Sequence, residues 1–266
     1  MAKFIKKKSL GQNFLRDKNA LRKIVDAAEI TENETVLEIG PGEGNLTEEL
    51  LARGARVIAV EKDDRLISVL QEKFASQMSS GKFTLVHADI LFFHPNAYGL
   101  EPRAYFVIAN IPYYITGEII RKALSEWPQP KKAVLLVQKE VAERICSKDG
   151  KESILSISVK AYGNPKIAGI VKAGAFSPSP KVDSAILLIS NISKNSFENV
   201  DEQRFFEIVK TGFAHKRKIV SANLRPIFGE NTEKILTECE IDPQSRAETL
   251  SLAKWLSLAA KPRNTI

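Results

Sequence analysis

Two kinds of hydrophobic periodicity alternate along the first part of the chain. Short, continuous apolar runs predict buried strands over residues 35–39, 57–60, 83–86, 105–109, 133–137 and 185–189. Around these runs, apolar residues recur at helical spacing and predict helices over 21–28, 45–53, 66–74 and 118–125. Buried strands that alternate with amphipathic helices are typical of βαβ units around a parallel sheet. The pattern therefore predicts an α/β fold, with a Rossmann-like sheet that carries helices on both faces.

The pattern changes in the last quarter of the chain. Residues 191–199 are polar and predict a linker. Beyond them no strand-like run follows, and one helical face is formed by Phe205, Val209, Phe213, Val220 and Leu224. We therefore predict two domains. Residues 1–194 hold the sheet and a basic N-terminal segment, and residues 195–266 form a small all-helical domain.

The composition is that of an ordinary globular protein of 266 residues, with 44% hydrophobic and 27% charged residues. No stretch approaches the roughly 18 uninterrupted apolar residues of a membrane span, and no apolar run follows the N-terminal lysines as in a secretory signal. Two cysteines favour a reduced, cytoplasmic setting, and with three histidines they predict no metal site. We expect a monomer that does not associate with membranes.

The formal net charge of +7 is concentrated at one end of the chain. Residues 1–23 contain eight lysines or arginines and one aspartate, which accounts for the whole excess. A basic tail of this kind either binds a polyanion or serves as a solubilising terminus, and charge alone favours neither.

A glycine-rich turn follows the first predicted strand, as Gly40-x-Gly42-x-Gly44. The second strand ends in Glu61, whose carboxylate can accept both hydrogen bonds of a ribose diol, and Asp89 follows the third strand, where it can accept an adenine amine. Nicotinamide and S-adenosylmethionine sites both use such acids. The glycine spacing differs from that of dinucleotide sites, and the carboxylate of Glu43 disfavours a diphosphate. S-adenosylmethionine is therefore the favoured cofactor.

The turn after the fourth predicted strand is the most specific signal in the chain, with the sequence Asn110-Ile111-Pro112-Tyr113. An exocyclic amine of a nucleobase is a poor nucleophile, because its lone pair is delocalised into the ring. Hydrogen bonds from that amine to Asn110 Oδ1 and to the Ile111 carbonyl would free the lone pair, and Pro112 stiffens the turn. Tyr113 offers a ring on which the base can stack. The ordinary alternative is an Asn-Pro surface turn.

Several motifs give the chain a family resemblance. Asn-Ile-Pro-Tyr-Tyr-Ile at 110–115, with Glu-Ile-Gly-Pro-Gly-Glu-Gly-Asn-Leu-Thr at 38–47, resembles the ribosomal RNA adenine N6,N6-dimethyltransferases. Residues 8–15 are similar to the family's basic N-terminal motif, and residues 138–144 to its segment after the fifth strand. Residues 176–184 resemble the motif whose phenylalanine faces the target base. The matches are spread over about residues 8–256.

This resemblance implies specific site residues. The cofactor contacts fall on Asn13, Leu15, Gly40, Glu61, Asp89 and Asn110. The catalytic set is Asn110, Pro112, Tyr113 and Phe176, with the target adenine between Tyr113 and Phe176 and no metal. Many members follow the tyrosines with a Ser/Thr pair and a proline. Here Thr116-Gly117-Glu118 takes that place. The departure concerns only where the next helix begins, and the acceptor atoms of Asn110 and Ile111 are unaffected.

The C-terminal motifs resemble the branch of the family that modifies the small ribosomal subunit. These are Phe-Ala-His-Lys-Arg-Lys at 213–218, followed by Asn223-Leu224, and Arg-Ala-Glu-Thr-Leu-Ser at 246–251. The resemblance implies dimethylation of the N6 amines of adjacent adenosines near the 3′ end of small-subunit ribosomal RNA during ribosome biogenesis. Residues 1–194 would then be catalytic and 195–266 would bind RNA or the ribosome. We expect residues 213–218 to form a basic helix that tracks phosphates.

Four alternatives stay open at this point. The chain could be a large-subunit RNA methyltransferase of the macrolide-resistance type, or a non-catalytic assembly factor that keeps the fold. A nicotinamide oxidoreductase is disfavoured by the glycine spacing and by the Asn-Ile-Pro-Tyr turn. A DNA adenine methyltransferase is disfavoured by the extent of the family resemblance.

Overall fold

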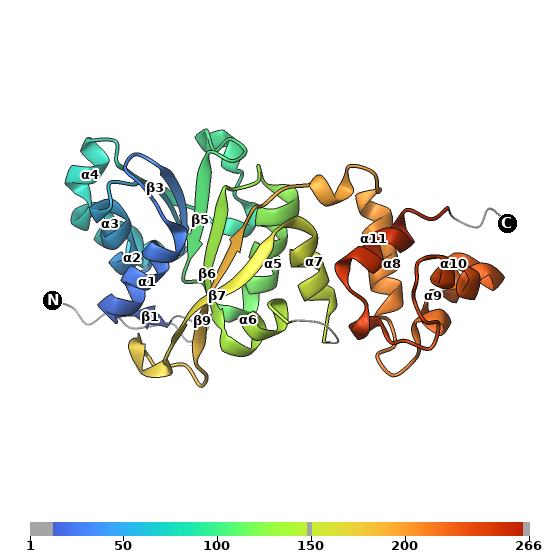
Figure 1. The fold of residues 1–266 in the computed structure, drawn as a ribbon. Coiled ribbons are helices and arrows are strands. Elements are labelled where there is room, and N and C mark those ends of the chain that lie inside the picture. The colour runs from blue at the N-terminus through green and yellow to red at the C-terminus, as the bar shows by residue number, and fades with distance from the viewer. Residues whose placement is uncertain (1–12, 148–150, 263–266) are drawn as a thin grey trace. The chain divides into compact units, whose positions relative to one another are not determined.

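A seven-stranded sheet dominates the first part of the structure (Figure 1), a computed structural model that describes residues 13–147 and 151–262. The strand order is β4-β3-β2-β5-β6-β9-β7. The bounds are β2 (Thr35–Ile39), β3 (Arg56–Glu61), β4 (Phe83–His87), β5 (Tyr105–Ala109), β6 (Lys132–Gln138), β7 (Asn164–Val171) and β9 (Ser184–Ser190). The six predicted strands are confirmed.

The sheet is mixed and not wholly parallel as predicted. The strands from β4 to β6 are parallel, whereas β9 runs antiparallel to β6 and β7 runs antiparallel to β9. Residues 172–183 join β7 to β9 without a crossover helix, and such a connection favours antiparallel pairing. Strand β7 was not predicted because it is an edge strand with an irregular register, and it contains Pro165 and Gly169.

Helices cover the sheet on both faces. Those of the first part are α1 (Lys18–Ala28), α2 (Asn45–Ala52), α3 (Asp64–Lys73), α4 (Ala75–Ser79), α5 (Thr116–Arg121) and α6 (Lys139–Ile145). Helices α1, α2 and α3 lie beside the strands (Figure 1). Their buried residues share one core with alternate strand residues such as Val57 and Phe106. The adjacent strand residues Ile58 and Val107 are also buried. Because successive strand side chains point to opposite faces, the second face is covered as well.

The strand order places chemistry-bearing residues at one edge of the sheet. The chain winds from β2 outward through β3 to β4, and then returns to place β5 on the other side of β2. Ligands of open α/β sheets bind at the carboxyl ends of the strands where the order reverses in this way. Gly40 follows β2, Glu61 ends β3, Asp89 comes after β4 and Asn110 follows β5.

The chain divides into two compact units, and the division differs from the predicted one. The first unit is 1–142 with 164–192, and the second is 143–163 with 193–266. The predicted boundary at 194 keeps 143–163 with the sheet, whereas the compact units group these residues with the C-terminal helices. Residues Ile157 and Ala161 explain the difference, because they lie in the same hydrophobic core as the C-terminal helices.

The second unit is helical in the residues that the structure describes. Its helices are α7 (Ile154–Tyr162), α8 (Glu202–Gly212), α9 (Val220–Phe228), α10 (Thr232–Glu238) and α11 (Leu252–Ala259). Phe205, Val209, Val220 and Leu224 are all fully buried in its core, as their periodicity predicted. Every helix described in either unit is too short or too polar to span a membrane.

The basic segment 213–218 is a turn between α8 and α9, so the prediction of a basic helix is wrong. Helix α8 ends at Gly212, where an added Cβ would lie 2.4 Å from the Trp255 ring. The Asn223 side chain then donates hydrogen bonds to the carbonyls of Gly212 (2.7 Å) and His215 (3.2 Å). These carbonyls are satisfied by a side chain and do not need a further helical turn.

Candidate active site

One pocket in the first unit is lined by every residue that the sequence predicted for the site. The cavity is open to solvent at its mouth. The predicted residues along its wall are Asn13, Leu15, Gly40, Glu61, Asp89, Asn110, Pro112, Tyr113 and Phe176. The structure thus brings the proposed cofactor and base contacts into one cavity, and their individual roles stay predictions.

The loop from β2 to α2 lets a ligand approach the backbone closely. Gly40 has a φ of +66°, in the left-handed region that favours glycine, and a Cβ built on it would meet nothing within 4 Å. Because Gly40 lines the pocket, that empty space belongs to the ligand cavity. At Gly44, which caps α2, an added Cβ would lie 2.6 Å from the Phe74 ring. The loop is therefore closed on its protein side and open at Gly40.

Glu61 lies beside the glycine loop in the cavity wall. Its Oε2 atom accepts a hydrogen bond from the Gly42 backbone N–H (3.1 Å), and its Oε1 atom accepts one from Asp63 N–H (2.8 Å). Only 6% of Glu61 is exposed, and this burial raises the pKa of its carboxyl group against the lowering effect of those N–H donors. Each oxygen retains acceptor capacity, so a diol could bind a carboxylate that the backbone already holds in place.

Asp89 is held from two sides. Its Oδ1 atom accepts a hydrogen bond from Leu91 N–H (3.0 Å), and its Oδ2 atom lies 2.7 Å from the Lys62 ammonium. Burial acts to raise the pKa of Asp89, but the Lys62 hydrogen bond and the Leu91 N–H outweigh it and the pKa is lowered. Asp89 is therefore a carboxylate at neutral pH, as an acceptor for an adenine amine must be.

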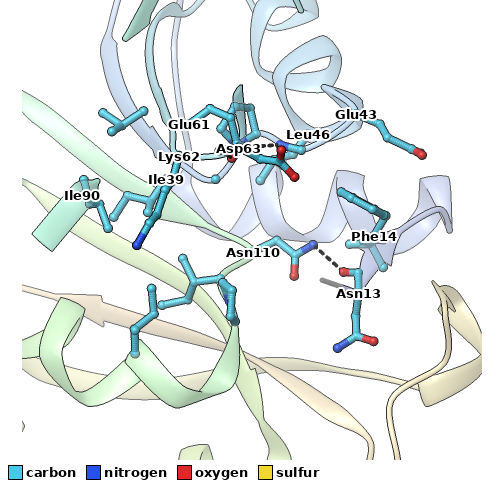
Figure 2. Close-up of a pocket in the computed structure, with 18 of the residues that line it drawn as sticks. Asn13, Phe14, Ile39, Glu43, Leu46, Glu61, Lys62, Asp63, Ile90 and Asn110 are labelled. Carbon is cyan, nitrogen blue, oxygen red and sulfur yellow. Dashed lines mark hydrogen bonds between the residues drawn. The ribbon is translucent and has the colours of Figure 1, made fainter. Parts of the chain in front are cut away.

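The Asn110 turn presents its acceptors beside this acidic wall. The Asn110 amide nitrogen points toward the Asn13 carbonyl at 3.5 Å (Figure 2), a long contact that leaves Oδ1 as the atom available to a substrate amine. The Tyr113 hydroxyl forms a 2.7 Å hydrogen bond with Ser184 Oγ, and burial raises the pKa of that tyrosine. Tyr113 is thus anchored at its hydroxyl end, while its ring lines the pocket.

Two short strands that the sequence did not predict connect the parts of the site. Strand β1 (Phe14–Leu15) pairs antiparallel with β8 (Phe176–Ser177), which brings Leu15 opposite Phe176. The Leu15 carbonyl also accepts a hydrogen bond from Asn45 at the start of α2 (2.9 Å). Phe176 is only 6% exposed, so most of its ring packs in the core and a small part faces the cavity.

Sequence reasoning also missed the site roles of Lys62, Asp63 and Tyr114, which line the same pocket. Lys62 and Asp63 follow Glu61 directly, so their closeness to that residue in the sequence was the available signal. The lysines of 3–8 and the start of the N-terminal motif lie outside the described residues. In residues 13–147 and 151–262, no three His, Cys, Asp or Glu side chains gather in a way that could hold a metal ion.

Carboxylates outnumber cations among the residues that line the cavity. Four carboxylates, of Glu43, Glu61, Asp63 and Asp89, line it together with one ammonium group, that of Lys62. Glu43 is ion-paired with an exposed arginine, Arg16, at 3.1 Å. Its carboxylate would therefore repel a bound diphosphate less strongly than the sequence alone indicated. Asp63 and Asp89 are ion-paired as well, with Arg65 at 2.5 Å and Lys62 at 2.7 Å. The Glu61 carboxylate instead accepts hydrogen bonds from the backbone N–H groups of Gly42 and Asp63.

Comparison with known proteins assigns the chain as a whole. The profile of the ribosomal RNA adenine dimethylase family matches residues 3–261. A relative from Dehalococcoides mccartyi (strain CBDB1), named ribosomal RNA small subunit methyltransferase A, is 43% identical over 255 residues, which cover 95% of this chain and 87% of the relative.

Solved structures agree with that assignment over most of the chain. A dimethyladenosine transferase from Plasmodium falciparum superposes with a TM-score of 0.77 at 28% identity, covering 92% of this chain and 95% of the other. The 23S rRNA methyltransferase ErmE superposes with a TM-score of 0.73 at 29% identity, covering 92% and 98%. With a family match from near the first residue to near the last, this chain is a methyltransferase of the ribosomal RNA adenine dimethylase family.

Proposed function

We propose that the protein uses S-adenosylmethionine to dimethylate the N6 amines of two adjacent adenosines near the 3′ end of small-subunit ribosomal RNA. The observation that carries this proposal is the shared cavity. The glycine loop and its two carboxylates line one part of it, and the Asn110 turn lines another. A methyl donor and an adenine amine could therefore meet within a single pocket.

The residues present fit S-adenosylmethionine. Its sulfonium and amino groups carry positive charge, and the cavity wall holds more carboxylates than cations. The open space at Gly40 would accept the part of the ligand that passes closest to the backbone. Glu61 would accept hydrogen bonds from the ribose hydroxyls, and Asp89 from the adenine amine. When bound, the cofactor supplies an electrophilic methyl group.

The Asn110 turn would activate the amine. Asn110 Oδ1 and the Ile111 carbonyl would accept its two N–H hydrogen bonds, which draws the nitrogen toward a tetrahedral geometry and frees its lone pair. No strong general base is needed, because the nitrogen becomes acidic once it is methylated and then sheds its proton. After one methyl transfer one N–H remains, so an acceptor can still hold the amine for a second transfer.

Positioning would supply most of the rate. Holding two reactants in line can contribute about 7–11 kcal/mol. The Tyr113 ring, anchored through its hydroxyl to Ser184, would stack on the target adenine. The exposed edge of Phe176 would border the other side of that base.

The choice of RNA is supported by the names of the relatives and by the basic turn. The relative at 43% identity is named for the small subunit, whereas ErmE, at 29%, is named for 23S rRNA. His215, Lys216, Arg217 and Lys218 are all exposed on the turn and could contact phosphates. The free cysteines Cys146 and Cys239 support a reducing compartment such as the cytoplasm, where we expect a monomer to act.

A substrate competition tests the proposal. Purified protein with labelled S-adenosylmethionine is offered isolated small subunits, naked small-subunit RNA and large-subunit RNA, and the products are digested and analysed by mass spectrometry. Dimethyladenosine chiefly in the small subunits is the expected result. Label mainly in large-subunit RNA would favour the macrolide-resistance type of activity, and no label in any substrate would favour a non-catalytic assembly factor.

A further inference from the structure

Tyr114 is an aromatic side chain at the pocket mouth that neither the fold nor the proposed chemistry uses. It is 69% exposed, although it directly follows Tyr113 and lines the same cavity. A large exposed aromatic ring at the rim of a binding cavity is a common feature of surfaces that receive another ring.

The local backbone sends the two tyrosines in different directions. They are the first two residues of the same 3₁₀ helix, Tyr113–Ile115. A 3₁₀ helix has about three residues per turn, so successive side chains point about 120° apart. Tyr113 is directed toward Ser184, to which its hydroxyl is bonded, and Tyr114 is directed toward solvent. Two rings are thus offered by adjacent residues, one within the cavity and one at its mouth.

A cation accompanies the outer ring. The Lys62 side chain is 62% exposed and lines the same pocket. Its hydrogen bond to Asp89 raises the pKa of Lys62, and the neighbouring Tyr114 hydroxyl adds to that effect. A fixed ammonium group beside an exposed aromatic ring is the combination that binds single-stranded nucleic acid, in which the ring stacks on a base and the cation faces a phosphate.

We propose that Tyr114 stacks on the nucleotide next to the target adenosine, while Lys62 faces the phosphate that joins the two. This inference rests on the proposed function, in which RNA is the substrate. An enzyme that modifies a base must take that base out of its stack, and the neighbouring base then loses a stacking partner. Tyr114 replaces that partner. Where two adjacent adenosines are both substrates, Tyr114 holds one of them while the other occupies the cavity.

The test removes the ring and the neighbouring base separately and together. Parent protein, Tyr114→Leu and Tyr114→Phe are compared on small subunits in which the two adjacent adenosines are intact, and on small subunits in which one of them is replaced by uridine, a weaker stacking base. The matched control is Tyr98→Leu, since Tyr98 is an exposed tyrosine, at 40%, that does not line the pocket. Initial rates give KM and kcat, and calorimetry gives the Kd of S-adenosylmethionine.

On intact particles, Tyr114→Leu should raise KM about 5- to 100-fold with little change in kcat, while Tyr114→Phe and Tyr98→Leu behave like the parent. The uridine substitution should raise KM for the parent and leave that of Tyr114→Leu nearly unchanged, because both changes remove the same stacking interaction.

Each failure has its own signature. If the parent methylates no small subunit, the proposed function is wrong. If the parent is active and Tyr114→Leu matches it, or if the two substitutions raise KM independently, the stacking role is wrong and the function stands. A larger Kd for S-adenosylmethionine in Tyr114→Leu would place the ring against the cofactor and also overturn the inference.

Discussion

A methyl group added at Gly40 should separate cofactor binding from backbone strain. Gly40 has a φ of +66° and open space where a Cβ would lie, and that space is part of the pocket. Gly81 offers a matched control, because its φ is +71°, a Cβ there also meets nothing within 4 Å, and it is exposed away from the pocket. Alanine substitution at either position carries the same conformational penalty, but only one of them intrudes on the ligand.

The magnitudes follow from these two terms. An L-residue in the left-handed region costs about 1–2 kcal/mol, part of which is offset because alanine restricts the unfolded chain by about 0.4–1 kcal/mol. Gly40→Ala and Gly81→Ala should therefore each lower the free energy of unfolding by about 1 kcal/mol, a Tm decrease of about 2–4 °C. Overfilling a packed site costs about 1–3 kcal/mol more, so Gly40→Ala alone should weaken S-adenosylmethionine binding about 5- to 150-fold.

Thermal unfolding and calorimetric titration of the three proteins check this prediction. Equal Tm decreases with a selective loss of affinity in Gly40→Ala are expected. If Gly40→Ala bound S-adenosylmethionine as tightly as the parent, the cofactor would not pass over this glycine. If Gly81→Ala lost as much affinity, the effect would be one of stability and not of the site.

Further substitutions probe the other parts of the site. Glu61→Ala should cost about 2–4 kcal/mol of S-adenosylmethionine binding in calorimetry, because charge-assisted hydrogen bonds are removed, and a Kd equal to that of the parent would contradict the assignment. Asn110→Ala should lower the single-turnover rate at saturating cofactor far more than the affinity for RNA; near-normal turnover would refute amine activation. Replacing residues 216–218 by alanine should weaken binding to small subunits and leave cofactor binding unchanged. The slope of the logarithm of the binding constant against the logarithm of the salt concentration should fall in magnitude by about 0.7–0.9 for each phosphate that is no longer neutralised. Burial raises the pKa of Glu38 to about 8. Its protonated form therefore stabilises the fold fully below about pH 4.5, and this stabilisation is lost as the pH rises toward 8. In Glu38→Gln the free energy of unfolding should vary less with pH over this range, and a pH dependence equal to that of the parent would show that the carboxyl group does not titrate there.

The buried position of Glu38 explains why its titration should be visible. It is 1% exposed, and its Oε2 atom accepts a 2.7 Å hydrogen bond from Thr47 in the first turn of α2. Its Oε1 atom has no hydrogen-bond partner among the described residues. An ionised carboxylate in that place would be poorly solvated, and its neutral form is therefore favoured.

Sequence alone determined the features that local pattern encodes. Mostly apolar runs identified six strands, because strands buried on both faces need few polar positions, and only the edge strand β4 of these six exposes a residue inside its run, Thr84. The glycine loop, Glu61, Asp89 and the Asn110 turn each end or follow a predicted strand, and parallel strands present their carboxyl ends at the same edge of a sheet. The structure places all of them around one pocket.

Tertiary structure decided the features that depend on residues far apart in the chain. The pairing of Phe14–Leu15 with Phe176–Ser177 has no local signature, since two-residue strands have no period and their partner lies in another part of the sequence. The turn at 213–218 has helical periodicity on both sides, but Asn223 and the close approach of Trp255 to Gly212 end the helix there. Residues 143–163 lie between two predicted strands of the sheet, 133–137 and 185–189, yet α7 buries Ile157 and Ala161 in the helical core. In each case the deciding energy is an interaction between distant residues, which periodicity within a single element cannot report.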